Sequence, residues 1–416
     1  MNVTGIIAEY NPFHKGHQYQ ISYVKNKLKA DYIVVVMSGD FVQRGTPALL
    51  PKHLRAEMAL RGGADLVLEL PVQSSSSSAE FFAEGAVSLL EGIGTVTDLC
   101  FGSEEGQTEG MLNAARILNE EPETYREYLR QSLKAGFSFP AARNQALLQY
   151  ASNASLSVSG KEISRLLSSP NNILGIEYCR VLLKKHSSIK PVTLKRKGAG
   201  YHEKELTSHQ APSASAIRAF LEKSPDCSAL KEWLPEGSLS LLQNAAAADS
   251  FLTEKDLDLL LHYRLLTLTA EQMMEFHDIS SDLAQRVCRQ LNKYQGFSQF
   301  SDLLKTKEIT RARIQRGLLH LLLGVRTPAR EVPFAHVLGF RREASPLLKE
   351  IKKRGTIPLL TKLASASDHL SSEALAFLDV NTRASNIYES MLCKKERRAF
   401  VHEYQKPVVI LDRRTC

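Results

Sequence analysis

The chain has 416 residues, of which 43% are hydrophobic and 24% charged, and its formal net charge at pH 7 is +8. This length suits two or three domains, and the composition is that of a globular protein. No apolar stretch reaches the ~20 residues of a membrane-spanning helix, and the first residues lack the basic and apolar regions of a signal peptide, so we expect a cytoplasmic protein without membrane contact. The six cysteines are widely spaced and form no CxxC pair, which argues against a disulfide framework and a structural zinc site.

Charge is distributed unevenly along the chain. Residues 301–416 contain 22 Lys and Arg against 12 Asp and Glu, whereas residues 1–240 contain 26 against 25. A balanced half joined to a basic half is typical of a protein that holds an extended polyanion with its basic part. A solvated helical domain without a nucleic-acid role would carry the same charge, so composition alone leaves both interpretations open.

The first twenty residues carry the strongest local pattern. The apolar run 3–8 predicts a buried strand, Asn11-Pro12 breaks it, and an amphipathic helix begins near Gly16. A helix start presents unpaired backbone N–H groups and the positive end of its dipole, which suits a phosphate. His14 and His17 lie one turn apart there and can both donate to phosphate oxygens, while Gly16 lets the backbone come close. A chance or merely structural pair of histidines is the alternative.

Four further apolar runs predict strands, at 31–37, 64–71, 96–101 and 192–196, and helices are expected at 51–62 and 79–90. This alternation predicts an α/β fold with a Rossmann-like, doubly wound parallel sheet. Ligands bind beyond the carboxyl ends of such strands, so Gly102 and the loop 38–45 should face the site of His14. Arg44 in that loop would meet a phosphate or carboxylate there, or be an ordinary surface arginine. The run 73–78, with its five serines, indicates a loop.

The rest of the chain is expected to be helical. A helical insertion at about 108–165 interrupts the first domain, 1–228, and an all-helical domain, 229–416, follows it. Within the second domain, 310–323 predicts a basic amphipathic helix. Contacts to nucleic-acid phosphates are expected at two basic clusters, one formed by Arg311, Arg313 and Arg316 and the other by Lys394, Lys395, Arg397 and Arg398.

A second motif, Pro212-Ser213-Ala214-Ser215-Ala216-Ile217-Arg218, follows the last predicted strand. At a helix start, backbone N–H groups, hydroxyls and a guanidinium can converge on one anion. An N-cap followed by a solvated arginine is the alternative. His-x-Gly-His after a strand, together with this Ser-x-Ser-x-x-Arg element, resembles the HxGH nucleotidyltransferase superfamily. Its members hold ATP at this turn and stabilise attack on the α-phosphate.

Five blocks narrow the resemblance to one family. They are Gly-Ile-Ile-Ala-Glu-Tyr-Asn-Pro-Phe-His at 5–14, Ser-Gly-Asp-Phe-Val-Gln-Arg-Gly at 38–45, Arg-Ala-Glu-Met-Ala-Leu at 55–60, Ala-Asp-Leu-Val-Leu-Glu-Leu-Pro at 64–71 and Ser-Pro-Asn-Asn-Ile-Leu at 169–174. In this order they are similar to the bacterial tRNA(Met) cytidine acetate ligases, and the similarity extends over the full length. Asp40 departs from the asparagine common in that family's loop.

The resemblance implies a two-step reaction. Acetate and ATP give acetyl-adenylate, and the acetyl group passes to N4 of the wobble cytidine, C34, of elongator tRNA(Met), forming N4-acetylcytidine. It implies catalytic roles for His14, His17 and Arg218, and Mg²⁺ that is bound with ATP without dedicated protein ligands. The implied ATP-binding residues are Gly5, Ile6, Ile7, Ala8, Glu9, Tyr10, Asn11, Pro12, Phe13, His14, Lys15, Gly16, His17, Gln18, Gly102, Asn171, Arg196, Ser213 and Ser215.

Two other functions fit parts of the pattern. One is a small-molecule nucleotidyltransferase that puts AMP or CMP on a phosphorylated metabolite, which would leave the basic helical extension without a role. The other is a noncatalytic RNA-binding protein that kept a nucleotide fold, against which the intact His14, His17 and Arg218 argue. The expected partners are acetate and elongator tRNA(Met), and no protein partner is evident.

Overall fold

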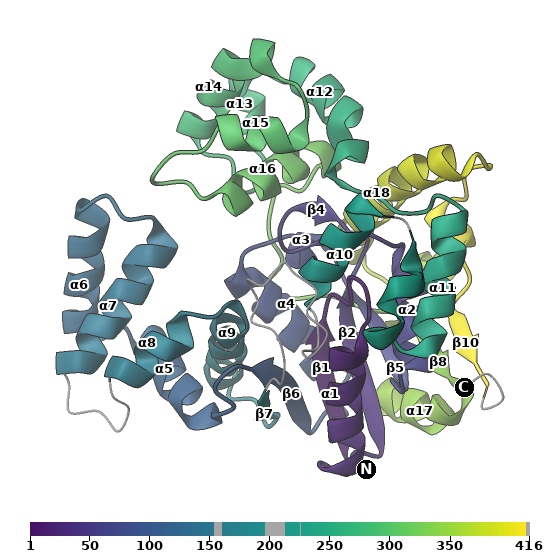
Figure 1. The fold of residues 1–416 in the computed structure, drawn as a ribbon. Helices are drawn as coiled ribbons and strands as arrows, with labels where there is room; N and C mark the ends of the chain where they lie inside the picture. The colour runs from purple at the N-terminus through teal and green to yellow at the C-terminus, as the bar shows by residue number, and fades with distance from the viewer. Residues whose placement is uncertain (154–159, 196–212, 225, 413–416) are drawn as a thin grey trace.

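The protein is built around a central sheet. The computed structural model describes residues 1–153, 160–195, 213–224 and 226–412. In the described part its strand order is β10-β8-β5-β2-β1-β6-β7, with β9 paired beside β8 (Figure 1). The five strands from β5 to β7 are parallel, and β8 joins β5 in the antiparallel direction. The strands are β1 (Val3–Ala8), β2 (Tyr32–Ser38), β5 (Leu66–Leu70), β6 (Asp98–Ser103), β7 (Lys190–Lys195), β8 (Ala335–Arg341), β9 (Leu359–Leu360) and β10 (Val409–Leu411).

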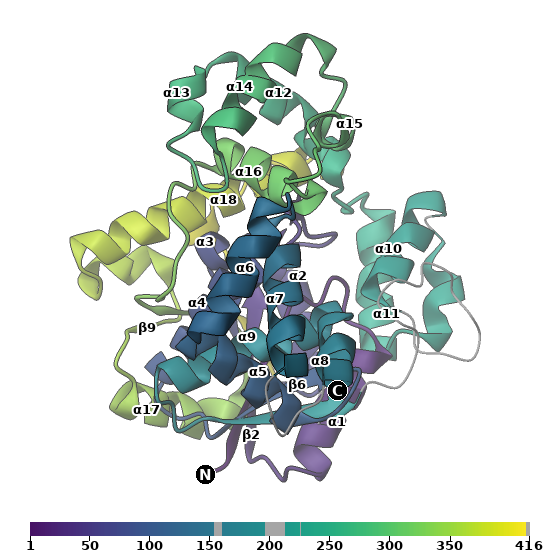
Figure 2. The same cartoon turned by 90° about the vertical axis from the view of Figure 1, so that its left-hand side faces the viewer.

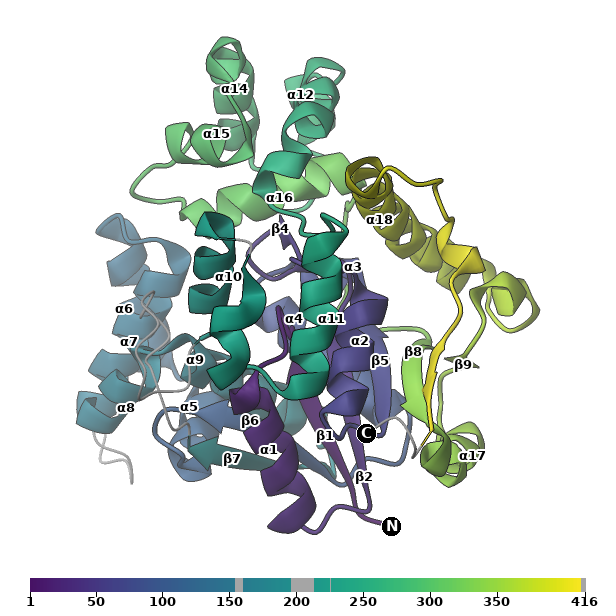
Figure 3. The same cartoon turned by 45° about the vertical axis from the view of Figure 1, so that its right-hand side comes forward.

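Both faces of the sheet are covered by helices, as the apolar runs require. In β2, Ile33 and Val35 enter one hydrophobic core and Val34 and Val36 the other, because successive side chains of a strand point to opposite faces. Figure 3 shows the helices of the first face in front of the sheet: α1 (Lys15–Asn26), α2 (Lys52–Arg61), α10 (Ala214–Lys223) and α11 (Glu236–Ala247). The second face carries α4 (Ala79–Gly92), α5 (Thr108–Glu120), α9 (Pro170–Lys184) and α17 (Ser345–Arg354).

The strand order predicts a ligand-binding position beside β1, at the carboxyl ends of the strands, which we call the crevice. The chain passes from β1 to β2 and β5 on one side, and later continues with β6 and β7 on the other side. The connections therefore diverge between β1 and β6, where open α/β sheets bind ligands beyond the carboxyl ends of their strands. The predicted α/β class and parallel sheet are thus confirmed, and the predicted strands correspond to β1, β2, β5, β6 and β7.

Two helical lobes flank the sheet. The predicted insertion consists of α5 with α6 (Glu123–Lys134), α7 (Phe139–Asn153) and α8 (Gly160–Leu167), and Figure 2 shows α6 and α7 in front of the other elements. The second lobe lies beyond the crevice end of the sheet (Figure 1). It contains η2 (Glu254–Leu257), α12 (Asp258–Leu266), α13 (Ala270–Met273), α14 (Ser281–Gln290), η3 (Leu291–Lys293), α15 (Phe297–Leu303) and α16 (Arg311–Leu323).

The C-terminal part differs from the all-helical domain that the sequence predicted. Residues 335–411 return to the sheet and supply β8, β9 and β10, in addition to α17 and the long α18 (Ser372–Glu396). The physical reason is that β8 alternates between the two cores, with Val337 in one and Leu338 in the other. Short connecting elements are η1 (Cys227–Glu232), η4 (Arg342–Ala344), η5 (Leu363–Asp368) and η6 (Glu403–Gln405). No helix in the described residues has the length and apolar character to cross a bilayer.

The serine-rich run is also different from the loop that was expected. It begins within a short helix, α3 (Val72–Ser75), and four of its serines are buried. Ser75 Oγ donates to the Phe41 carbonyl at 2.9 Å and Ser76 Oγ to the Val72 carbonyl at 2.7 Å. Small hydroxyl side chains fit here because they pack closely and satisfy their own polar atoms on nearby carbonyls.

Candidate active site

The strand-turn-helix at the N-terminus forms as predicted, and its two histidines cap the helix. His14 is the N-cap of α1, and its Nδ1 accepts a hydrogen bond from the Gly16 N–H at 3.1 Å. The Nδ1 of His17 accepts from the His14 N–H at 3.2 Å. This is the reciprocal arrangement of a capping box, in which imidazoles take the places of the usual hydroxyl and carboxylate.

The expected unpaired N–H groups are therefore not present at this helix start. The Lys15 N–H donates to the Trp233 carbonyl at 2.9 Å, and the His17 N–H donates to the His14 carbonyl at 2.9 Å. Because each Nδ1 accepts a hydrogen bond, each neutral ring carries its hydrogen on Nε2. The backbone N–H groups of the turn are thus used within the protein, and the donor that each imidazole carries is on Nε2.

Aromatic packing holds the two rings in place. The His14 and His17 rings stack with centroids 3.7 Å apart, and Tyr10 and Phe13 lie 4.7 and 5.6 Å from His17. Gly16 makes the stack possible, since a Cβ there would lie 2.8 Å from Cε1 of His14. The glycine of the motif is therefore required by the His14 ring, and the rings are preorganised before any ligand binds.

The second predicted motif lies against this turn. Ser213 caps α10 by accepting from the Ala216 N–H at 3.2 Å. Arg218, one turn into α10, donates from Nη1 to the Asn11 carbonyl at 2.6 Å and from Nη2 to Ser215 Oγ at 3.3 Å. The structure therefore brings Arg218 beside the His14 turn from 207 residues away in sequence. Arg196 and Pro212 lie outside the described residues.

The carboxyl end of β6 forms the other side of the crevice. Gly102 is the penultimate residue of β6, and Asn171 Nδ2 donates to Glu104 Oε1 at 2.7 Å. Asn172 is fully buried, and its Oδ1 accepts from Ser103 Oγ at 2.9 Å, but its Nδ2 has no hydrogen-bond partner among the described residues. Buried polar atoms are nearly always paired, so this unpaired amide beside the end of β6 is a candidate contact for a polar ligand atom.

The remaining predicted ATP residues lie along β1 and the turn. Gly5 has a packing role of its own, because a Cβ there would lie 2.9 Å from Leu90 Cδ1. The Asn11 side chain accepts from the Leu49 N–H at 2.8 Å, and it supports the loop that follows β4 (Thr46–Pro47). Ile6, Tyr10, Asn11, Pro12 and Phe13 are buried, Ile7, Ala8, Glu9 and Gln18 are half-buried, and Lys15 is exposed.

The loop after β2 contains a buried aspartate, Asp40, and an exposed arginine, Arg44. Asp40 is buried, and its Oδ1 accepts from the Lys52 N–H at 2.9 Å, so it supports α2. Arg44 is exposed between β3 (Phe41–Val42) and β4. Gly45 next to it has φ +77° and touches the α16 backbone, where a Cβ would lie 2.5 Å from the Arg316 nitrogen. This hairpin therefore connects the crevice with the helical lobe.

The basic helix α16 forms as predicted, but its three arginines are engaged. Arg316 is only 13% exposed and pairs with Asp278 at 2.9 Å, and Arg313 approaches the same carboxylate at 3.6 Å. Arg311 pairs with Asp302 at 2.8 Å. Arg316 is consequently part of the lobe's internal structure, whereas Arg313 and Arg311 remain more than 40% exposed.

The second basic cluster, at the end of α18, is divided in the same way. Lys395 donates to the Phe251 carbonyl at 2.5 Å, and Arg398 pairs with Glu389 and Glu396. Lys394 and Arg397 are exposed and have no ion-pair partner within the described ranges. Although α18 is not one of the elements of the second lobe, it packs against α16.

A group of His277, Asp278 and His320 resembles a metal site by composition, since its ligand atoms lie within 4.8 Å of one another. Asp278 is, however, already paired with arginines, His320 Nδ1 lies 3.1 Å from the His277 carbonyl, and His320 Nε2 lies 3.1 Å from the Ser76 hydroxyl oxygen. Burial lowers the pKa of His320 to about 4, so its ring is neutral at pH 7. The group has a structural role, because His320 connects α16 with Ser76 at the end of α3.

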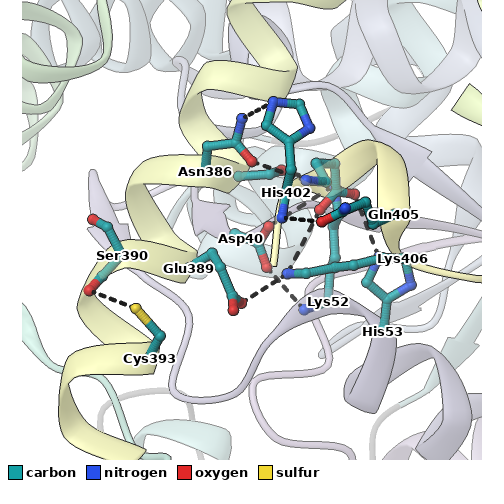
Figure 4. A network of polar contacts seen from close by, with 12 residues as sticks. Asp40, Lys52, His53, Asn386, Glu389, Ser390, Cys393, His402, Gln405 and Lys406 are labelled. Atoms are coloured by element: carbon teal, nitrogen blue, oxygen red, sulfur yellow. Dashed lines mark hydrogen bonds and ion pairs between the residues drawn. The ribbon is translucent and has the colours of Figure 1, made fainter. Parts of the chain in front are cut away.

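Two buried cations on α2 were not predicted as functional. Lys52 and Arg55 are fully buried, with Ala56 and Ala59 on the same helix face. The available signal was the presence of two cations at core positions of an otherwise apolar helix. Lys52 belongs to a polar network, drawn in Figure 4, that connects α2 with α18 and η6.

Comparison with known proteins gives matches over nearly the whole chain. The family model described as HIGH Nucleotidyl Transferase matches residues 1–403. A protein of Clostridium acetobutylicum named tRNA(Met) cytidine acetate ligase is 40% identical over 99% of this chain and 100% of its own length, and one of Clostridium tetani with the same name is 40% identical over 95% and 96%. Crystal structures of Thermotoga maritima TmcAL, apo and bound with alpha-thio ATP, are each 31% identical over 99% of this chain and 100% of their own, with TM-scores of 0.93 and 0.90.

Identity of this extent, over nearly the whole of both chains, indicates common descent rather than a shared fold alone. In this chain the HxGH turn and the Ser213–Arg218 motif lie against each other. The chain belongs to the tRNA(Met) cytidine acetate ligase family of the HIGH nucleotidyl transferases.

Proposed function

We propose that this protein is a tRNA(Met) cytidine acetate ligase, which activates acetate with ATP and acetylates N4 of the wobble cytidine, C34, of elongator tRNA(Met). The observation that carries the proposal is the meeting of His14, His17 and Arg218 at one turn, in a chain 40% identical over its full length to a relative of that name. Because ATP and tRNA are cytoplasmic substrates, we place the reaction in the cytoplasm.

In the first step a carboxylate oxygen of acetate attacks the α-phosphorus of ATP. The bond to the β-phosphate oxygen breaks, pyrophosphate leaves, and acetyl-adenylate remains. The Nε2–H groups of His14 and His17 would donate to phosphate oxygens as charge develops, and Arg218 would hold the pyrophosphate. No covalent nucleophile is needed, because acetate itself attacks. Mg²⁺ bound with ATP would neutralise phosphate charge, and its ligands would be the phosphates and water.

In the second step the exocyclic N4 of C34 attacks the acetyl carbonyl. AMP leaves with the electron pair of the broken C–O bond, and the nitrogen loses one proton to water. A wobble base can reach the adenylate because bases of single-stranded loops unstack readily. We infer that the adenosine lies toward β6, near Gly102, Asn171 and the unpaired Asn172 amide.

The tRNA body would lie along the helical lobe. The exposed arginines of α16 and the end of α18, with Lys394 and Arg397, would contact phosphates, which give affinity but no base choice. Arg44, on the exposed hairpin whose Gly45 packs against α16, would lie on the path from those contacts to the nucleotide. Selection of C34 would then depend on the crevice.

The deciding experiment is ATP–pyrophosphate exchange with a panel of small carboxylates and phosphorylated metabolites, followed by mass analysis of tRNA(Met) after reaction with ATP and acetate. Exchange that depends on acetate and N4-acetylcytidine at position 34 are expected. Exchange that depends only on a phosphorylated metabolite would favour a small-molecule nucleotidyltransferase. Absence of any exchange, with tRNA binding retained, would favour a noncatalytic RNA-binding protein.

A further inference from the structure

Arg55 has an unusual set of partners for a fully buried arginine. Its guanidinium contacts no carboxylate within hydrogen-bonding distance among the described residues. It donates instead to four backbone carbonyls, those of Leu50 at 2.9 Å, Glu9 at 2.6 Å, Ser38 at 3.1 Å and Gly39. Glu9 follows β1 and Ser38 ends β2, so one side chain ties together the carboxyl ends of two neighbouring strands.

The backbone that Arg55 holds is strained. Tyr10, directly after Glu9, has φ +46°, in the left-handed region that few residues other than glycine adopt. Such a residue costs about 1 kcal/mol or more and persists only where its surroundings hold it. The next carbonyl, that of Asn11, accepts from Arg218 at 2.6 Å. The strained residue Tyr10 therefore lies between two carbonyls that are each held by a guanidinium group. Arg55 donates to the carbonyl before it, that of Glu9, and Arg218 donates to the carbonyl after it, that of Asn11.

The helix that carries Arg55, α2, is itself held in place by the buried contacts of Lys52 (Figure 4). Lys52 Nζ lies 2.7 Å from carboxylate oxygens of Glu69 and Glu403, and it donates to Ser385 Oγ at 2.8 Å. Burial alone would lower the pKa of Lys52, but these carboxylates outweigh burial and raise it. The helix that carries Arg55 is thus held partly by Ser385 and Glu403, which lie more than 300 positions away along the chain.

Stability alone does not account for this arrangement. Burial lowers the pKa of Arg55, which reflects the cost of removing its charge from water. Buried charges are on the whole weak contributors to stability compared with well-packed apolar side chains of the same volume. What a planar guanidinium does supply is fixed geometry, because its N–H groups reach several acceptors in defined directions.

We propose that Arg55 is a positioning residue for acetate adenylation. It holds the turn from Glu9 to Asn11 so that His14 and His17 keep their stacked orientation toward the phosphates, and it does not touch the ligand. The inference rests on the proposed function. It adds that the geometry of the adenylation site depends on Arg55 and on the buried contacts that hold α2.

The test compares Arg55→Lys and Arg55→Gln with Arg61→Lys, a matched control on the same helix whose partially exposed side chain pairs with Glu57 at 2.6 Å. A lysine keeps the charge but lacks the planar fork, so it cannot hold both strand ends. The readouts are the kcat of acetate-dependent ATP–pyrophosphate exchange, the KM for ATP and the thermal unfolding midpoint. For both Arg55 variants we expect kcat to fall about 10- to 100-fold, since a displacement of about 1 Å has that effect.

The KM for ATP should change less than about threefold, because the missing interaction acts on geometry in the transition state rather than on ground-state binding. Arg61→Lys should match the unmodified protein in all three readouts. An Arg55→Lys variant with unchanged kcat would overturn the proposal, and so would a failure of both Arg55 variants to fold, which would make Arg55 a residue of stability. If the unmodified chain shows no exchange with acetate, the proposed function fails instead.

Discussion

Replacement of Gly16 by alanine tests the His14–His17 stack without removing either histidine. The new Cβ would lie 2.8 Å from Cε1 and 3.0 Å from Nδ1 of His14. Non-bonded carbons prefer about 3.5 to 4.0 Å, so the ring would have to move by roughly 0.7 to 1.2 Å. A misplacement of that size costs about 10²-fold in rate, or about 2.7 kcal/mol of transition-state stabilisation.

The same substitution should change stability very little. Loss of the capping bond from the Gly16 N–H to His14 costs about 1 kcal/mol, but alanine is favoured over glycine in a helix by up to about 1 kcal/mol. The two effects nearly cancel. We therefore expect acetate-dependent ATP–pyrophosphate exchange to fall about 100-fold while the free energy of unfolding in urea changes by less than about 1 kcal/mol.

Gly237→Ala is the matched control for this substitution. Gly237 is also the second residue of its helix, α11, and a Cβ there would lie 3.3 Å from Cδ of Arg61, a flexible side chain that can yield. Exchange should be unchanged in this variant. If Gly16→Ala also retained exchange within about twofold of the unmodified protein, the preorganised stack would not be part of the mechanism.

Three further outcomes are expected. Arg218→Ala should reduce exchange at least about tenfold and leave tRNA binding in a filter assay unchanged, because it loses a charged phosphate donor and the contact to Asn11. The free energy of unfolding should fall by about 1.5 kcal/mol between pH 6.5 and pH 5, because His320 has a folded pKa of about 4 and takes up its proton only on unfolding. His320→Gln should remove much of this slope. Charge reversal at Lys394 and Arg397 should weaken tRNA binding and lower its salt slope by about one unit per lost phosphate contact, while exchange is spared.

Each of these has an outcome that would contradict it. Normal exchange with lost tRNA binding in Arg218→Ala would reassign Arg218 to the RNA surface. A flat stability curve above pH 5 would mean that the buried ring is already charged in the folded protein. For the basic cluster, reversal at the exposed Lys352 and Lys353 of α17 is the control, and an equal loss of binding there would show a general effect of net charge. Arg316 is unsuitable for such a test, because its reversal would break the pair with Asp278.

The sequence by itself determined the local architecture of the candidate site. The apolar run before Asn11-Pro12, the spacing of His14 and His17 and the Ser213–Arg218 motif each depend on neighbouring residues, and each forms the predicted element. The parallel α/β class also followed from local signals, because buried strands and amphipathic helices differ in periodicity. The family resemblance rested on the same blocks of sequence, and it is confirmed by the match over residues 1–403.

Only the tertiary structure decided which polar groups remain available to a ligand. The N–H groups at the start of α1 looked unpaired in sequence, but they are taken by the two imidazoles and by the carbonyl of Trp233, which lies more than 200 residues away. The sequence predicted that Arg316 contacts phosphates, but in the fold its guanidinium forms an ion pair with Asp278. The strands β8 and β10 escaped prediction for the same reason. Pairing between distant segments leaves almost no local trace, because a partner's identity depends on the fold and not on spacing along the chain.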